Sequence, residues 1–93
     1  CMMKVYIHKA VRTAVGSFNG QFKNVSAVQL GAECVKACSF DDHTQKQINP
    51  DQVIMGNVLS AGVGQAPARQ VALASGLHPN VICTTVNKVC SSG

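Results

Sequence analysis

Three short apolar segments alternate with two segments of helical periodicity, and this alternation constrains the fold more than any other feature. Residues 4–8, 53–59 and 81–86 are rich in the β-branched and aromatic side chains that favour strands. Helical patterns occupy residues 26–38 and 67–75. The order β-α-β-α-β predicts an α/β fold with a parallel sheet and crossover helices. Because two helices cannot cover both faces of a parallel sheet, we expect residues 1–93 to be the front part of a larger domain.

Local sequence signals predict where both helices begin and where the second one ends. Ser26, with Gln29 three residues later, matches a capping box. Gly31 lowers helix propensity but permits a close packing neighbour. Pro67 suits the first position of the second helix, and Gly76 suits its end. The apolar stripe of the first helix consists of Ala27, Leu30, Cys34 and Cys38.

The connections between these elements are polar or rich in small residues. Residues 9–25 carry Gly, Ser and Asn and predict a long loop. Residues 41–52 are polar and contain Asn49-Pro50, so a surface connection is expected there. Residues 61–65 form a small-residue loop that includes Gly62-Val63-Gly64. This loop lacks the spacing of a phosphate-binding loop, so we assign it a turn or packing role.

Charge and hydropathy argue against two classes of partner. The formal net charge is +4, but the Lys and Arg residues are scattered and form no patch interleaved with aromatics. Nucleic-acid binding is therefore not expected. No segment approaches the roughly 20 apolar residues of a membrane-spanning helix, so no membrane partner is expected either.

The five cysteines predict free thiols in an intracellular protein, mitochondrial or cytoplasmic. Their number is odd, there is no C-x-x-C motif, and no histidine lies at ligand spacing from them. A metal site is therefore not expected. We interpret Cys34, Cys38 and Cys83 as small buried side chains.

Cys90 is the candidate nucleophile. It follows the predicted strand 81–86 and stands where a further helix is expected to begin, with Lys88 two residues earlier. Ligands bind at the carboxyl ends of parallel strands, and a helix N-terminus favours the reactive thiolate. A buried structural cysteine remains the alternative on position alone. His78, in the turn before this strand, is an unfavourable candidate base, and Arg69 is expected to make a structural hydrogen bond or a subunit contact.

Five sequence blocks resemble those of the thiolases, in the family's order and over nearly the whole chain. The opening VRTAVGSFNG is similar to the family's VRTPxGSFxG, with Ala14 where Pro is common. The other four blocks are SAVQLG (26–31), VIMGNVL (53–59), GQAPARQ (64–70) and CTTVNKVCSSG (83–93). The last block is similar to the family's nucleophile motif and contains Cys90. Within the family, the blocks are more similar to acetyl-CoA acetyltransferases than to long-chain 3-ketoacyl-CoA thiolases.

The resemblance implies that residues 1–93 are the front part of the thiolase N-terminal domain. It implies acyl transfer between coenzyme A thioesters without metal or tightly bound cofactor, with acetyl-CoA and acetoacetyl-CoA as partners. Cys90 would carry the acetyl group, and its backbone N–H would help to bind the thioester oxygen. The family's activating His and second catalytic Cys belong to motifs beyond Gly93, and the family commonly forms homotetramers.

Two alternatives stay open at this point. One is a thiolase with a broad range of 3-ketoacyl-CoA substrates. The other is a truncated and inactive binding module.

Overall fold

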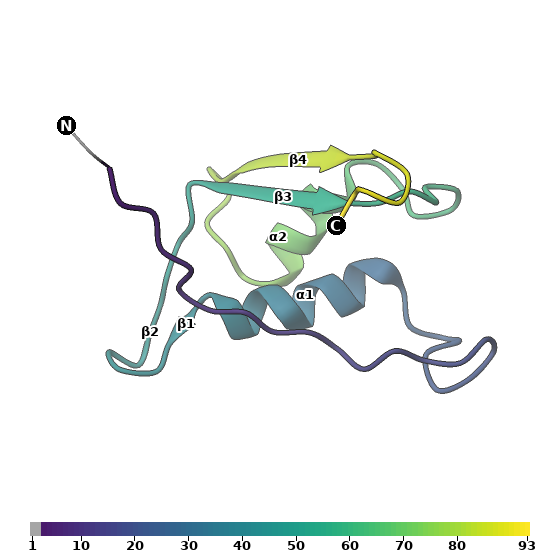
Figure 1. The fold of residues 1–93 in the computed structure, drawn as a ribbon, viewed down its shortest axis with the longest axis horizontal. Coiled ribbons are helices and arrows are strands. Elements are labelled where there is room, and N and C mark those ends of the chain that lie inside the picture. Colours follow the sequence, from purple (N-terminus) through teal and green to yellow (C-terminus); the bar gives the residue numbers. More distant parts are fainter. Residues whose placement is uncertain (1–2) are drawn as a thin grey trace.

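A computed structural model describes residues 3–93; Cys1 lies outside the described residues. The elements are α1 (Ala27–Cys38), β1 (Phe40–Asp41), β2 (Lys46–Gln47), β3 (Gln52–Gly56), α2 (Pro67–Ala74) and β4 (Ile82–Val86). Strands β3 and β4 pair in parallel, and α2 is the crossover helix between them. Helix α2 packs on this strand pair, and α1 packs against α2 (Figure 1). The predicted α/β class is confirmed.

The start of α1 follows its sequence signal. Ser26 Oγ accepts a hydrogen bond from the Gln29 backbone N–H at 3.1 Å, and Gln29 Oε1 accepts one from the Ser26 N–H at 2.7 Å. This capping box satisfies two donors that the first turn would otherwise leave free. A Cβ placed on Gly31 would lie 3.0 Å from Met55 Cε and 3.1 Å from Val71 Cγ2. Gly31 therefore permits the close approach of α1 to β3 and α2, as predicted.

Helix α2 is fixed to the sheet at its first turn. Pro67 occupies the start of the helix, as expected, and the Ala68 N–H donates to Thr85 Oγ1 of β4 at 3.0 Å. The helix ends before Gly76, which adopts a φ of +78°. This left-handed conformation is typical of the residue that closes a helix.

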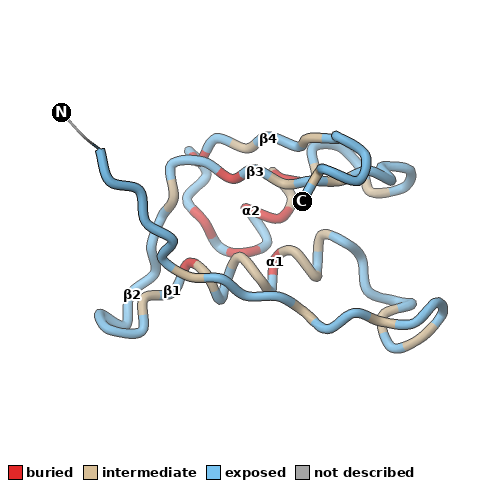
Figure 2. Tube along the Cα trace, in the orientation of Figure 1, coloured by how far each residue is buried: buried red, intermediate tan, exposed pale blue. Residues whose placement is uncertain are grey.

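The buried core is small and lies on the helix-covered side of the strands. Its members are Ala32, Val53, Ala68, Val71, Ala72, Leu77 and Val81. Figure 2 shows that the buried positions gather on α2, on the loop that follows it and on the start of β3. On the opposite face of the strands, Ile54 and Ile82 are exposed. One face of the parallel pair is thus uncovered within residues 3–93.

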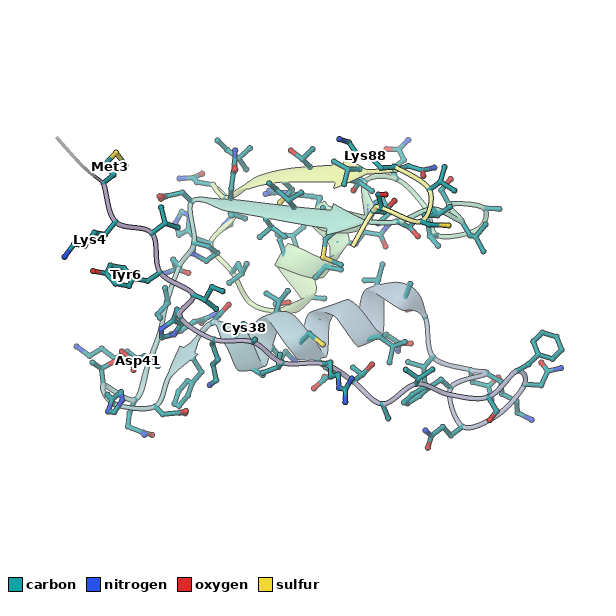
Figure 3. All side chains as sticks on the ribbon, in the orientation of Figure 1. Met3, Lys4, Tyr6, Cys38, Asp41 and Lys88 are labelled. Carbon is teal, nitrogen blue, oxygen red and sulfur yellow. The ribbon has the colours of Figure 1, made fainter. Side chains whose placement is uncertain are left out.

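The prediction of a strand over residues 4–8 is wrong. The segment is irregular, and Val5 and Ile7 are 91% and 89% exposed. Figure 3 shows Met3, Lys4 and Tyr6 pointing away from the rest of the molecule. The observed order α-β-β-β-α-β therefore lacks the expected first strand. Strand propensity alone does not form a strand, because the backbone groups also need a paired partner.

The connection over residues 41–52 contains an element that sequence analysis missed. Strands β1 and β2 form a short antiparallel hairpin, with Phe40 opposite Gln47. The His43 N–H donates to Asp41 Oδ1 at 2.9 Å, and this hydrogen bond lowers the pKa of Asp41. Lys9 Nζ lies 3.3 Å from Asp42 Oδ2 and joins the N-terminal segment to the hairpin. Two-residue strands give too little alternation to be predicted.

Among residues 3–93, no helix has both the length and the apolar character needed to cross a membrane.

Candidate active site

The chain leaves β3 and β4 at the same edge of the sheet. Gly56 pairs with Val86 in the parallel register, so both carboxyl ends meet there (Figure 1). Two hydrogen bonds join the exits: the Asn57 N–H donates to the Val86 carbonyl at 3.0 Å, and Asn87 Nδ2 donates to the Val58 carbonyl at 3.4 Å. This edge is where parallel α/β proteins place ligands.

Cys90 lies at this edge, on a turn built from residues 87–92. Cys90 is exposed to solvent. The Val89 N–H donates to Asn87 Oδ1 at 2.9 Å, and the Ser91 N–H donates to the Lys88 carbonyl at 3.1 Å. Ser92 Oγ accepts from the Lys88 N–H at 2.7 Å and donates to the Val89 carbonyl at 2.8 Å. The turn around Cys90 is therefore closed by side chains on both sides of the cysteine.

Gly56 brings this turn against the end of β3. A Cβ placed on Gly56 would collide with the backbone of Ser92, whose carbonyl carbon would lie 2.8 Å away. This close approach needs a residue without a side chain. Strand β3 ends at Gly56, so the predicted end at Leu59 is wrong by three residues.

The helix expected to begin at Cys90 is not present among the described residues, where 88–91 form bridge and turn positions and 92–93 are irregular. Activation of the Cys90 thiol by a helix N-terminus therefore stays a prediction. What the structure does provide is an exposed cysteine on a hydrogen-bonded turn at the carboxyl edge of β3 and β4.

The other cysteines differ from Cys90 in burial. Cys34, Cys38 and Cys83 are half-buried, so the prediction that they are small buried side chains is only partly right. Figure 3 places Cys38 on α1, well apart from the turn that carries Lys88. Within residues 3–93, no three Cys, His, Asp or Glu side chains gather in a way that could hold a metal ion.

Two other polar residues that the sequence raised as alternatives have structural roles. Arg69 Nη1 donates to the Val81 carbonyl at 3.2 Å, which confirms the expected structural hydrogen bond. His78 Nδ1 accepts from the Asn80 N–H at 3.2 Å in the turn before β4. His78 and Cys90 lie at opposite ends of β4, whose five residues span about 16 Å. His78 does not reach Cys90.

Three residues of this site, Asn87, Ser92 and Gly56, are not among those predicted from the sequence. Asn and Ser that bond the backbone two or three residues away are a known turn device. The N-x-x-C-x-S spacing around Cys90 could have indicated it. The contact of Gly56 with Ser92 had no local signal, because it joins residues far apart in the sequence.

Comparison with known proteins identifies the family of this chain. Residues 5–93 match the family model described as the N-terminal domain of thiolase. The chain belongs to the thiolase family. An acetyl-CoA acetyltransferase from Escherichia coli is 53% identical over 92 residues, which are 99% of this chain and 23% of that relative. The acetyl-CoA acetyltransferase of Schizosaccharomyces pombe is 50% identical over 90 residues, which are 97% of this chain and 22% of that relative.

A solved thiolase has the same fold over most of the chain. The crystal structure of the Acat5 thiolase from Ascaris suum, in complex with coenzyme A, matches with a TM-score of 0.76 and 40% identity. The match covers 88% of this chain and 21% of that one. The chain thus has a partial thiolase fold and spans less than a quarter of the length of these thiolases.

Proposed function

We propose that this chain is the nucleophile-bearing segment of an acetyl-CoA C-acetyltransferase. The reaction condenses two acetyl-CoA to acetoacetyl-CoA and also runs in the thiolytic direction. The observation that carries the proposal is the exposed Cys90 on its closed turn, at the carboxyl edge of β3 and β4, in a chain of the thiolase family. The curated relatives named above are acetyl-CoA acetyltransferases, which favours the acetyl substrate over longer 3-ketoacyl groups.

In the first half-reaction, the Cys90 thiolate attacks the carbonyl carbon of acetyl-CoA. The carbon–sulfur bond to coenzyme A breaks, the released thiolate takes up a proton, and Cys90 becomes an acetyl thioester. A backbone N–H at Cys90 is suited to stabilise the negative oxygen of the tetrahedral intermediate. Covalent catalysis of this kind replaces one difficult transfer by two easier ones.

In the second half-reaction, a base removes a methyl proton from another acetyl-CoA, and the resulting carbanion attacks the acetyl-Cys90 carbonyl. Acetoacetyl-CoA forms, and Cys90 leaves as the thiolate. His78 does not reach Cys90, and we propose that this base is a second catalytic cysteine. This cysteine and the activating histidine would come from the parts of a thiolase that lie outside the matched 93 residues.

A hybrid enzyme tests the proposal. In this hybrid, the 93 residues replace the matching segment of the Escherichia coli acetyl-CoA acetyltransferase, which is 53% identical over 92 residues. We expect the hybrid to cleave acetoacetyl-CoA and to carry label from [¹⁴C]acetyl-CoA on the peptide that holds Cys90. A folded hybrid that does not turn over, or that is labelled elsewhere, would contradict the proposed function.

Gly56→Ala in the hybrid is expected to reduce turnover by about 10-fold or more, the size of effect that small misplacements of reacting groups produce. The added methyl group collides with the Ser92 backbone, so the turn that carries Cys90 must move. Thiolysis rate and thermal unfolding are measured together. Ile54→Val, two residues earlier on the same strand face, serves as the control and should keep the parent rate. Unchanged turnover in Gly56→Ala would show that the position of Ser92 does not matter for the reaction.

A further inference from the structure

The residue before Cys90 has an unusual backbone conformation. Val89 has a φ of +53°, in the left-handed region. Among residues 3–93, the other non-glycine residues with positive φ are Asn19, Gln45 and Ala66, and none of these is β-branched. A β-branched residue is disfavoured in this region because its side chain crowds the backbone. Such a conformation persists only where the surroundings hold it in place.

Side chains hold both polar backbone groups of Val89. Its N–H donates to Asn87 Oδ1 at 2.9 Å, and its carbonyl accepts from Ser92 Oγ at 2.8 Å and from the Ser92 N–H at 3.2 Å. Ser92 Oγ is itself fixed by the Lys88 N–H at 2.7 Å. Val89 is therefore restrained from both sides by the residues that close the turn.

Asn87 also links this turn to the neighbouring strand exit. Its Nδ2 donates to the Val58 carbonyl at 3.4 Å, while its Oδ1 accepts from Val89. A single amide thus connects the chain leaving β3 with the residue before the nucleophile. These hydrogen bonds do not include Cys90, and one of them goes to Val89, the residue directly before the cysteine.

We infer that Asn87 is a positioning residue for Cys90: its amide holds Val89 in the left-handed conformation, and this conformation sets the direction of the Cys90 side chain. The inference rests on the proposed function, in which Cys90 is the acetyl acceptor. A rotation about the backbone of Val89 turns every following atom, so its release to negative φ would redirect the thiol. Ser92 supports the same geometry from the other side.

The first test is Asn87→Ala in the hybrid enzyme. We expect kcat and the single-turnover acetylation rate of Cys90 to fall by about 10- to 100-fold, the range expected for a misplaced reacting group. The KM for acetoacetyl-CoA should stay unchanged, because no substrate contact is removed. Thermal unfolding of each variant is recorded, so that a loss of rate can be compared with a loss of stability.

Two rescue variants separate positioning from a general structural role. Asn87→Ser keeps an oxygen that can accept from the N–H two residues later, and it should recover most of the acetylation rate. Val89→Gly, added to Asn87→Ala, removes the penalty for positive φ and should recover part of the rate without restoring the hydrogen bond. The inference would be overturned if Asn87→Ala had the same kcat as the unmutated hybrid. It would also be overturned if neither rescue variant reversed the loss of acetylation rate.

The same experiment distinguishes this inference from the proposed function. If the unmutated hybrid is not labelled at Cys90, the proposed function fails. If Cys90 is labelled, and labelled equally fast in Asn87→Ala, the proposed function stands and only the positioning role of Asn87 fails.

Discussion

Cys90→Ser in the hybrid enzyme is expected to lower acetyl transfer by at least about 10⁴-fold, the scale on which removal of the nucleophile disables other covalent catalysts. A cysteine thiol is far more acidic than a serine hydroxyl, so the substitution removes the group that forms the attacking anion. Thiolysis of acetoacetyl-CoA and covalent labelling by [¹⁴C]acetyl-CoA measure the loss.

Cys83→Ser is the matched control for this experiment. Cys83 lies on β4, shortly before the turn, and its Sγ donates to the Val81 carbonyl at 3.6 Å. A serine hydroxyl can make the same bond, so folding and turnover should stay close to those of the parent hybrid. Equal labelling in the parent and in Cys90→Ser, or loss of label only in Cys83→Ser, would assign the nucleophile to another residue.

The 93-residue chain by itself is expected to show no thiolase turnover and no cooperative unfolding transition. Seven apolar residues are buried among those described, and the largest fully buried side chain is Val71. Ordering the backbone costs about 1–2 kcal/mol for each residue, and so small a core offsets little of this. The test combines thermal unfolding followed by circular dichroism with an acetoacetyl-CoA cleavage assay.

Exposed apolar surface strengthens this expectation. Ile54 and Ile82 are 62% and 60% exposed on the uncovered face of the strand pair. A two-stranded sheet with one bare face is marginal without further covering. Asn57 Nδ2 is buried and has no hydrogen-bond partner among residues 3–93, which costs about 1–3 kcal/mol.

The control for the isolated chain is the hybrid enzyme, in which the rest of the Escherichia coli enzyme surrounds the same residues. It should unfold cooperatively at a defined temperature. A sigmoidal transition in the isolated chain would show that residues 1–93 fold without the rest of a thiolase. Turnover above background by the isolated chain would show that these residues hold all the essential groups.

The sequence predicted the helices better than the strands. Ser26 with Gln29 at the start of α1, and Pro67 with Gly76 around α2, act through contacts within a few residues, so local signals locate them. The strand predicted over residues 4–8 failed because its hydrogen-bond partners must come from elsewhere in the chain. The hairpin of β1 and β2 was missed because two residues per strand carry almost no periodic signal.

By itself, the sequence determined the α/β class, the parallel crossover through α2, the thiolase resemblance and the choice of Cys90 as the candidate nucleophile. These depend on residue types and on spacing along the chain. Only the tertiary structure decided how Cys90 is held, through the Gly56 contact with Ser92 and the hydrogen bonds of Asn87 to Val58 and Val89. The first two of these contacts cross from the end of β3 to the turn after β4, and they exist only because the parallel register brings the two strand exits together. A backbone angle such as the positive φ of Val89 is likewise set by the contacts around it and not by its own residue type, which disfavours it.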